Sequence, residues 1–98
     1  MGDTEVRDNQ ESSRLEIAAD GEIAELVYRV RAGRLVLVHT GVPESLGGRG
    51  LGGELVRAAL AKAASGGLTV VPLCPFARDW LERHPGEAAA VTIDWPSS

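Results

Sequence analysis

The sequence has little of several features, and each scarcity excludes a class of protein. Its one cysteine, Cys74, excludes an internal disulfide, so we expect a reducing compartment, most simply a cytoplasmic one. No apolar run approaches the roughly 20 residues of a membrane helix, and the polar, acidic start does not resemble a signal peptide, so we expect no membrane partner. The net charge of -4 argues against a broad nucleic-acid surface, and we predict no such partner.

Length and composition favour one small domain. The chain has 98 residues, of which 44% are hydrophobic, enough for a packed core. Its negative charge is concentrated at the start, where four acidic residues stand against the single cation Arg7 within residues 1–12. This segment has no apolar periodicity and no aromatic residue. We therefore predict a flexible acidic tail over residues 1–12 and a single domain over residues 13–98.

Three segments after the tail have the pattern of β-strands. Residues 14–19 and 22–31 alternate between apolar and polar, and Asp20-Gly21 between them is a strong hairpin signal. Ala32-Gly33 makes the next turn, and residues 34–40 are apolar on both faces until His39. Short turns join all three segments, so we predict an antiparallel meander.

The pattern becomes helical after the third strand. From about Gly50 to Ser65, apolar residues recur on one helical stripe, and Gly66-Gly67 ends it. A short apolar strand follows over residues 68–73, then a second helix from Pro75 to about His84. Residues 87–98 favour helix in one half and strand in the other. We predict an α+β fold with a mixed sheet: a three-stranded meander, then helix, strand and helix with a right-handed crossover.

A glycine-rich turn joins the third strand to the first helix. A helix start leaves about four amide groups without intrahelical partners and carries partial positive charge. Glycine allows a bulky anion to approach this backbone. The alternative interpretation is a flexible loop for chain reversal; a P-loop is excluded because no Gly-Lys-Ser/Thr follows. We predict a phosphate site formed by seven consecutive residues: Gly47, Gly48, Arg49, Gly50, Leu51, Gly52 and Gly53.

These motifs together resemble the GCN5-related N-acetyltransferase (GNAT) superfamily, and within it a small single-domain subgroup. The superfamily's pyrophosphate signature, Gln/Arg-x-x-Gly-x-Gly/Ala, is matched at Gly50 and Gly52 and departs at Gly47. Two further segments resemble the subgroup, residues 38–43 and residues 71–76. Position 41 departs, because the subgroup leads us to expect glutamate where Gly41 stands. The resemblance covers about residues 14–86.

The resemblance implies a minimal GNAT-like fold that binds acetyl-CoA or coenzyme A. In that fold the strand ending near Thr40 and the strand ending near Leu73 splay apart around the pantetheine arm. It implies acetyl transfer to an amine acceptor, a small molecule or a peptide. Elements that usually shape the acceptor pocket are missing, so a non-catalytic CoA- or acyl-CoA-binding module is the alternative. A phosphate or nucleotide binder is a third reading. We expect a monomer or a homodimer.

Two residues are candidates for catalysis, Cys74 and His39. The resemblance places Cys74 near the thioester, and a helix start at Pro75 would stabilise its thiolate, so it is a candidate nucleophile. The alternative is a buried apolar cysteine. His39 is a candidate general base toward an amine or Cys74, or else a strand-end histidine with a structural role. Glu44 is more typical of a solvated loop than of a base, and we predict a structural role for His84. We predict no metal site.

Overall fold

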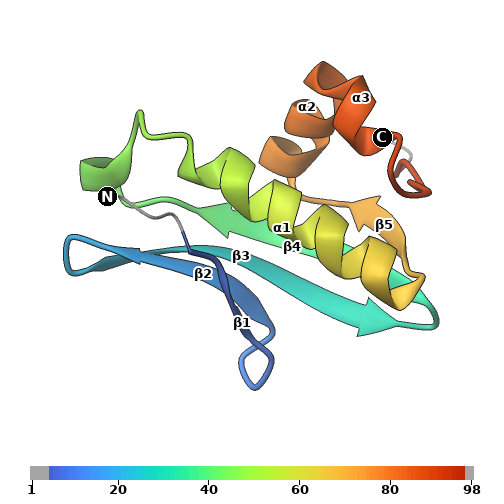
Figure 1. Cartoon of the computed structure of the whole chain (residues 1–98), viewed down its shortest axis with the longest axis horizontal. Coiled ribbons are helices and arrows are strands. Elements are labelled where there is room, and N and C mark those ends of the chain that lie inside the picture. The colour runs from blue at the N-terminus through green and yellow to red at the C-terminus, as the bar shows by residue number, and fades with distance from the viewer. Residues whose placement is uncertain (1–4, 97–98) are drawn as a thin grey trace.

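The computed structural model describes residues 5–96, which form a mixed five-stranded sheet with helices packed on it (Figure 1). The strands lie in chain order, β1-β2-β3-β4-β5; the first four are antiparallel, and β5 runs parallel to β4. The predicted α+β class, meander and helix–strand–helix order are confirmed. The elements are β1 (Arg7–Asn9), β2 (Arg14–Ala19), β3 (Glu22–Arg31), β4 (Arg34–Gly41), the 3-10 turn η1 (Glu44–Leu46), α1 (Leu51–Gly66), β5 (Thr69–Pro72), α2 (Pro75–Arg83) and α3 (Pro85–Ala88).

The two predicted hairpin turns are present. Asp20 and Gly21 have φ angles of 52° and 76°, and Ala32 and Gly33 have φ angles of 50° and 77°. Two successive positive φ values are the mark of the type I′ turn, whose twist matches that of the flanking strands. These turns set the register of the meander, in which Leu15 faces Leu26 across β2 and β3.

One face of the sheet carries the core, covered by α1. The helix lies in front of β4 in Figure 1 and contacts strands β2 to β5. Its predicted apolar stripe is buried throughout, and Gly67, with a φ of 65°, ends the helix as expected. The strand side chains that meet this stripe are almost completely buried: Leu15, Ile17, Ala24, Leu26, Tyr28, Leu35, Leu37 and Val70.

The side chains that alternate with these core residues line the opposite face, which we call the open face. Apart from Glu16, they are partly or fully exposed. Ile23, for example, is 53% exposed. These side chains are therefore accessible to a molecule that approaches the sheet from this side. The open face comprises Arg14, Glu16, Ala18, Ile23, Glu25, Val27, Arg29, Arg31, Val36, His39, Gly41 and Val71.

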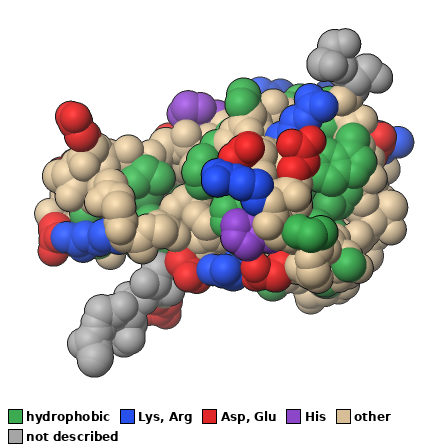
Figure 2. All heavy atoms as spheres, turned by 90° about the horizontal axis from the view of Figure 1, so that it is seen from above, with side chains coloured by type: hydrophobic (Ala, Val, Ile, Leu, Met, Phe, Trp, Pro, Cys, Tyr) green, Lys and Arg blue, Asp and Glu red, His purple; other side chains and the backbone are tan. Residues whose placement is uncertain are grey.

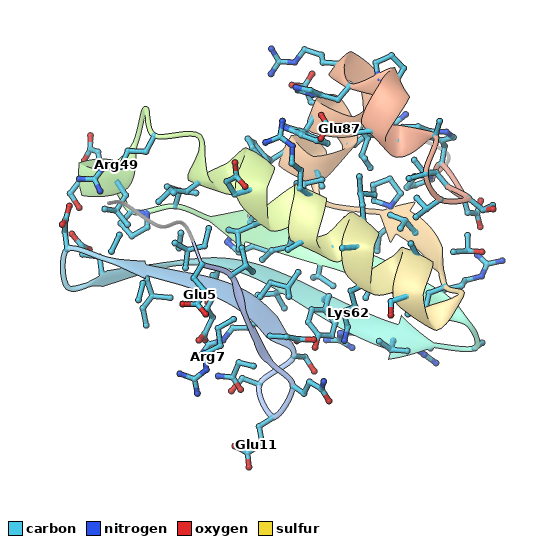
Figure 3. The ribbon with its side chains drawn as sticks, viewed as in Figure 1. Glu5, Arg7, Glu11, Arg49, Lys62 and Glu87 are labelled. Atoms are coloured by element: carbon cyan, nitrogen blue, oxygen red, sulfur yellow. The ribbon has the colours of Figure 1, made fainter. Side chains whose placement is uncertain are left out.

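The prediction of a flexible tail over residues 1–12 was wrong for Arg7–Asn9, which form β1 and pair with β2. Residues 1–4 of that segment lie outside the described residues. A polar clamp holds the strand: the Tyr28 hydroxyl donates to Asp8 at 2.6 Å, and Lys62 of α1 forms an ion pair with Asp8 at 2.7 Å. The Lys62 ammonium also lies 5.0 Å from the centre of the Tyr28 ring, and Figure 3 shows Lys62 projecting from α1 toward the sheet.

We expect Asp8→Asn to lower the free energy of unfolding at pH 7 by about 1–2 kcal/mol, because charge-assisted hydrogen bonds are lost. Burial alone would raise the pKa of Asp8, but hydrogen bonds from Lys62 and Tyr28 outweigh it and hold that pKa below 3.8. This stabilisation is thus complete well above pH 3.8 and is lost as the pH falls through the lowered pKa. Urea titrations at several pH values should show wild type and variant converging in acid, whereas exposed Asp79→Asn should differ from wild type by about 0.5 kcal/mol or less. A pH-independent difference would contradict the clamp.

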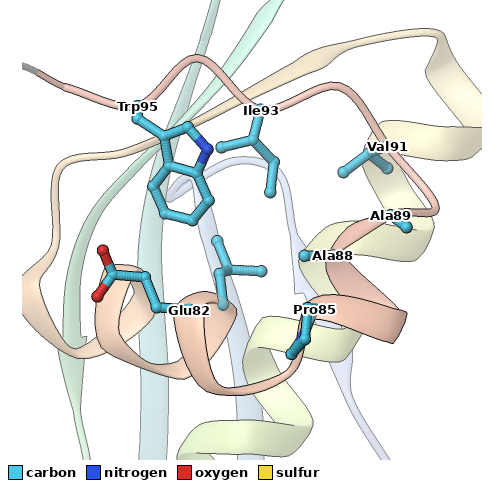
Figure 4. A pocket seen from close by; sticks show the side chains of 8 residues that line it. Glu82, Pro85, Ala88, Ala89, Val91, Ile93 and Trp95 are labelled. Carbon is cyan, nitrogen blue, oxygen red and sulfur yellow. The ribbon is translucent and has the colours of Figure 1, made fainter.

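The segment after α2 contains both a helix and a strand-like contact. Following α3, Ile93 forms a single parallel bridge with Val70 of β5, whose amide donates to Thr92 at 2.9 Å. This segment, α2 and α3 line an open hollow of about 360 Å³ beside Trp95 (Figure 4). Residues 97–98 lie outside the described part. Over residues 5–96, none of the helices has the length and apolarity needed to cross a bilayer.

Candidate functional site

The candidate site lies where β4 and β5 separate. The two strands pair from Arg34–Thr69 as far as Leu37–Pro72 and no further. There the Leu37 carbonyl accepts hydrogen bonds from the amides of both Leu73 and Cys74, at 3.0 and 2.9 Å, which turns the chain into α2. Residues 38–41 of β4 continue beyond the last paired residue of β5. The carboxyl ends of two parallel strands and the starts of α1 and α2 therefore meet at this fork.

In the glycine-rich turn at the start of α1, the backbone is not covered by side chains at its glycines. The first helical hydrogen bond runs from the Glu54 amide to the Gly50 carbonyl, at 3.1 Å, so the amides of residues 51–53 have no carbonyl four residues back within the helix. Gly48 and Gly50 have φ angles of 83° and 74°, and a Cβ at either would meet nothing within 4 Å. The start of α1 thus leaves amide donors without intrahelical partners, and such donors suit an anion.

Gly52 and Gly53 also allow α2 to approach α1 closely. A Cβ at Gly52 would lie 2.5 Å from the Phe76 ring, and one at Gly53 would lie 2.7 Å from Nε1 of Trp80. Both glycines are buried. Sequence reasoning assigned them to phosphate binding alone, because the partner that requires their small size lies more than 20 residues away in the chain.

Arg49 points away from the amides of α1 and forms an ion pair with Asp20 in the β2–β3 turn. Its side chain is about half exposed, and Figure 3 places it at the end of the molecule where η1 and that turn meet. A phosphate group at the start of α1 would have to draw Arg49 from Asp20 to gain its charge.

Cys74 is the N-cap residue of α2 and lies inside the fork. Its side chain is 3% exposed, and its Sγ lies 3.3 Å from Oγ1 of Thr40 on β4. Its carbonyl accepts the first hydrogen bond of α2, from Arg78 at 2.9 Å. The predicted position beside a helix start is correct, while the burial matches the alternative of a packed cysteine.

His39 and Cys74 lie on opposite faces of β4. The pairing of β3 with β4 slips by one residue between Val27 and Tyr28, so that Tyr28 faces Leu37 but Val27 faces His39. This irregularity reverses the alternation: His39 projects from the open face, where it is exposed, and Thr40 turns to Cys74. The geometry therefore does not support His39 as a base for Cys74.

Glu44 and His84 have the positions predicted for them, in a solvated loop and in a structural role. Glu44 is exposed in η1. The Nδ1 atom of His84 lies 2.8 Å from the Trp80 carbonyl oxygen, and the two rings stack with centroids 3.9 Å apart. His84 thus fixes the end of α2 against Trp80.

Comparison with known proteins identifies the family. The family model for GCN5-related N-acetyltransferases matches residues 14–91. The chain belongs to this family. A GCN5-like candidate N-acetyltransferase from Staphylococcus aureus, solved by NMR, is 27% identical, with a TM-score of 0.74 over 99% of this chain and 94% of its own. A comparison with curated proteins found no match.

In this GCN5-related protein, exposed apolar side chains flank the fork, a feature that sequence reasoning missed. Leu73 after β5 is 54% exposed, Phe76 at the start of α2 is 42% exposed, and Val42 after β4 is 37% exposed. In the sequence they resembled core residues because each adjoins an apolar element. Seen from the side of α2 and α3, hydrophobic side chains form separate patches among charged ones (Figure 2). Exposed apolar side chains such as these are suited to contact an uncharged ligand arm.

Proposed function

We propose that this GCN5-related protein binds acetyl-CoA at the fork and transfers the acetyl group to an amine acceptor. The observation that supports it is the row of amides at residues 51–53, freed by the start of α1 at the point where β4 and β5 separate. A diphosphate there would receive hydrogen bonds from several donors and the favourable end of the helix dipole.

The residues around the fork fit such a cofactor. The bare backbone at Gly48 and Gly50 leaves room for a diphosphate, and a side chain at either would occupy that space. Leu73 and Phe76 offer exposed apolar surface to the pantetheine arm. The edge of β4 beyond Leu37 is not paired with β5 and is available to polar groups of the arm. When bound, the cofactor supplies a thioester whose acyl carbon accepts an amine.

Two roles are open to Cys74. In direct transfer the amine attacks the acyl carbon, and Cys74 only lines the fork. In the covalent route, Sγ first takes the acetyl group from the cofactor, which is released as free CoA; the amine then takes the acetyl group and frees the Cys74 thiol. The burial of Sγ against Thr40 favours direct transfer, in which the protein contributes proximity and orientation.

A non-catalytic CoA- or acyl-CoA-binding module is the second candidate. The observation that favours it is that Cys74 is buried against Thr40 and His39 lies on the other face of β4, so the predicted base does not adjoin the thiol. Such a module would bind CoA as tightly as an enzyme would but release no thiol.

Calorimetry with CoA and acetyl-CoA, followed by thiol release across a panel of amines, tests the proposal. We expect saturable binding of both ligands and acceptor-dependent release of CoA. Direct transfer predicts that Cys74→Ala retains turnover and that intact-mass analysis finds no acetyl group on the wild type. Acetylation at Cys74 would establish the covalent route, and binding without release would favour the module. Absence of binding by folded protein would overturn all of these.

A further inference from the structure

On the open face near the end of β4, Gly41 leaves a space between two polar side chains that a side chain at position 41 would fill. A Cβ at position 41 would stand 3.4 Å from Nε2 of His39 and 3.7 Å from Oε2 of Glu25. Glu25 faces Gly41 across β3 and β4, and His39 precedes it by two residues, so all three share one face. Because residue 41 has no side chain, space remains between an imidazole nitrogen and a carboxylate oxygen. We call these three residues the Gly41 recess.

The Glu25 carboxylate is held in place with one oxygen directed to the recess. Its Oε1 atom accepts a hydrogen bond from Nη1 of Arg14 at 3.0 Å, and its Oε2 atom, like its Cγ atom, would lie 3.7 Å from a Cβ at position 41. Arg14 also forms an ion pair with Glu16 at 2.9 Å. Two carboxylates thus share one guanidinium, and this group of three keeps one net negative charge. Such a surplus suits a cation bearing N–H donors.

We propose that the Gly41 recess binds the primary ammonium group of the acceptor. This proposal rests on the proposed transfer function. The Oε2 atom of Glu25 accepts one N–H of the ammonium, and Nε2 of His39 accepts another. The recess adjoins Thr40, whose hydroxyl contacts Cys74 through the opposite face of the strand. An amine bound there lies beside the unpaired end of β4, one of the two strands that form the fork.

The proton balance assigns His39 its part in the reaction. The ammonium gives one proton to Nε2 of His39, and the freed nitrogen lone pair forms a bond to the acyl carbon. The carbon–sulfur bond breaks, and sulfur leaves with its electron pair as a thiolate. The new amide nitrogen loses a second proton to solvent. The imidazolium of His39 then gives up the first proton to solvent. The exposure of His39 to solvent permits that release.

The absence of a side chain at position 41 makes size a criterion of selection. A slender primary ammonium can place its nitrogen between Oε2 and Nε2. A quaternary ammonium carries the same charge but has no N–H and is broader. The pair n-butylammonium and tetramethylammonium therefore separates hydrogen-bonded recognition in the recess from general attraction of cations.

NMR of the imidazole signals tests the recess without depending on turnover. The chain has two histidines, so His39→Gln assigns the signal of each. We expect n-butylammonium to shift the His39 signal saturably, tetramethylammonium to leave it unchanged, and Glu25→Gln to weaken the apparent affinity about tenfold or more. Gly41→Val, which fills the space but keeps both charges, should do the same, while Arg29→Gln elsewhere on the open face should not. No saturable shift in wild type, or equal shifts in Glu25→Gln, would overturn the proposal.

Parallel calorimetry and kinetics separate this inference from the proposed function. We expect Glu25→Gln and Gly41→Val to bind CoA as wild type does and to raise the KM for the amine about tenfold with a smaller change in kcat. Normal CoA binding without a response of His39 to n-butylammonium would refute the recess and leave the cofactor site standing. A response of His39 in a protein that does not bind CoA would refute the acceptor role, together with the proposed function.

Discussion

Gly50→Asp is expected to weaken CoA binding about 100-fold, or about 2.7 kcal/mol, through the start of α1. Gly50 is the N-cap residue of α1, with φ 74° and ψ 19°, and a Cβ there points into open space. Aspartate and asparagine enter this left-handed region more readily than other residues with a side chain. The new carboxylate would lie beside the amides of residues 51–53, where it competes for the same donors and repels a diphosphate. Lost charge-assisted hydrogen bonds contribute about 1.5–3 kcal/mol.

The matched control is Gly50→Asn, which has nearly the same shape without the charge. We expect this variant to weaken CoA binding by about tenfold or less, so that the ratio between the two variants reports the electrostatic part. That ratio should shrink as salt is added, because exposed charges are screened. Calorimetry measures the affinities, and thermal unfolding checks that both variants remain folded. Equal affinities for the aspartate and asparagine variants would mean that the diphosphate does not bind at these amides.

The elements that could be predicted from the sequence are those determined by local interactions. Asp20-Gly21 and Ala32-Gly33 specify their turns by their own backbone preferences, and the apolar stripe of α1 follows from a spacing within one helix. The glycine turn belongs with them, because strand, glycines and helix occur in sequence. For the same reason, the position of Cys74 at the start of α2 was predictable.

The features that could not be predicted depend on partners distant in the chain. Strand β1 has no apolar residue and is ordered by the contacts of Asp8 with Tyr28 and Lys62, 20 and 54 residues away. The faces of His39 and Thr40 were not predictable either. Strict alternation from Leu37 would turn His39 to the core, and only the slip in the pairing of β3 with β4 reverses this.

The same principle explains why the Gly41 recess is absent from the sequence reading. Glu25 precedes Gly41 by 16 positions, and nothing local marks it as a functional carboxylate. Cross-strand pairing brings the two residues together, and Arg14 from a third strand fixes the carboxylate. The glycine at position 41, a departure from the family pattern, was interpreted as a lost carboxylate. In the folded chain, a carboxylate from the neighbouring strand lies beside the space that the glycine leaves.

Gly53→Ala is expected to lower the free energy of unfolding by about 2 kcal/mol, although alanine favours helix over glycine by about 1 kcal/mol. The reason is overpacking between α1 and α2. The added methyl group would lie 2.7 Å from Nε1 of Trp80. Trp80 is 7% exposed, stacks on His84 and lies beneath the Arg57 guanidinium, so its ring has little freedom to move aside. Gly52→Ala should cost less, because the Phe76 ring that it would strike is 42% exposed and can rotate outward.

Gly86→Ala provides the matched control, since Gly86 lies in α3 and a Cβ there would meet nothing within 4 Å. It should stay within about 0.5 kcal/mol of wild type or gain stability. Combining Gly53→Ala with Trp80→Phe should cost less than the sum of the single changes, because the smaller ring removes the clash. Urea unfolding of wild type, the two single variants and the double variant completes the cycle. A Gly53→Ala protein as stable as wild type would show that α2 can shift, and that Gly53 is not required for the packing of the two helices at the fork.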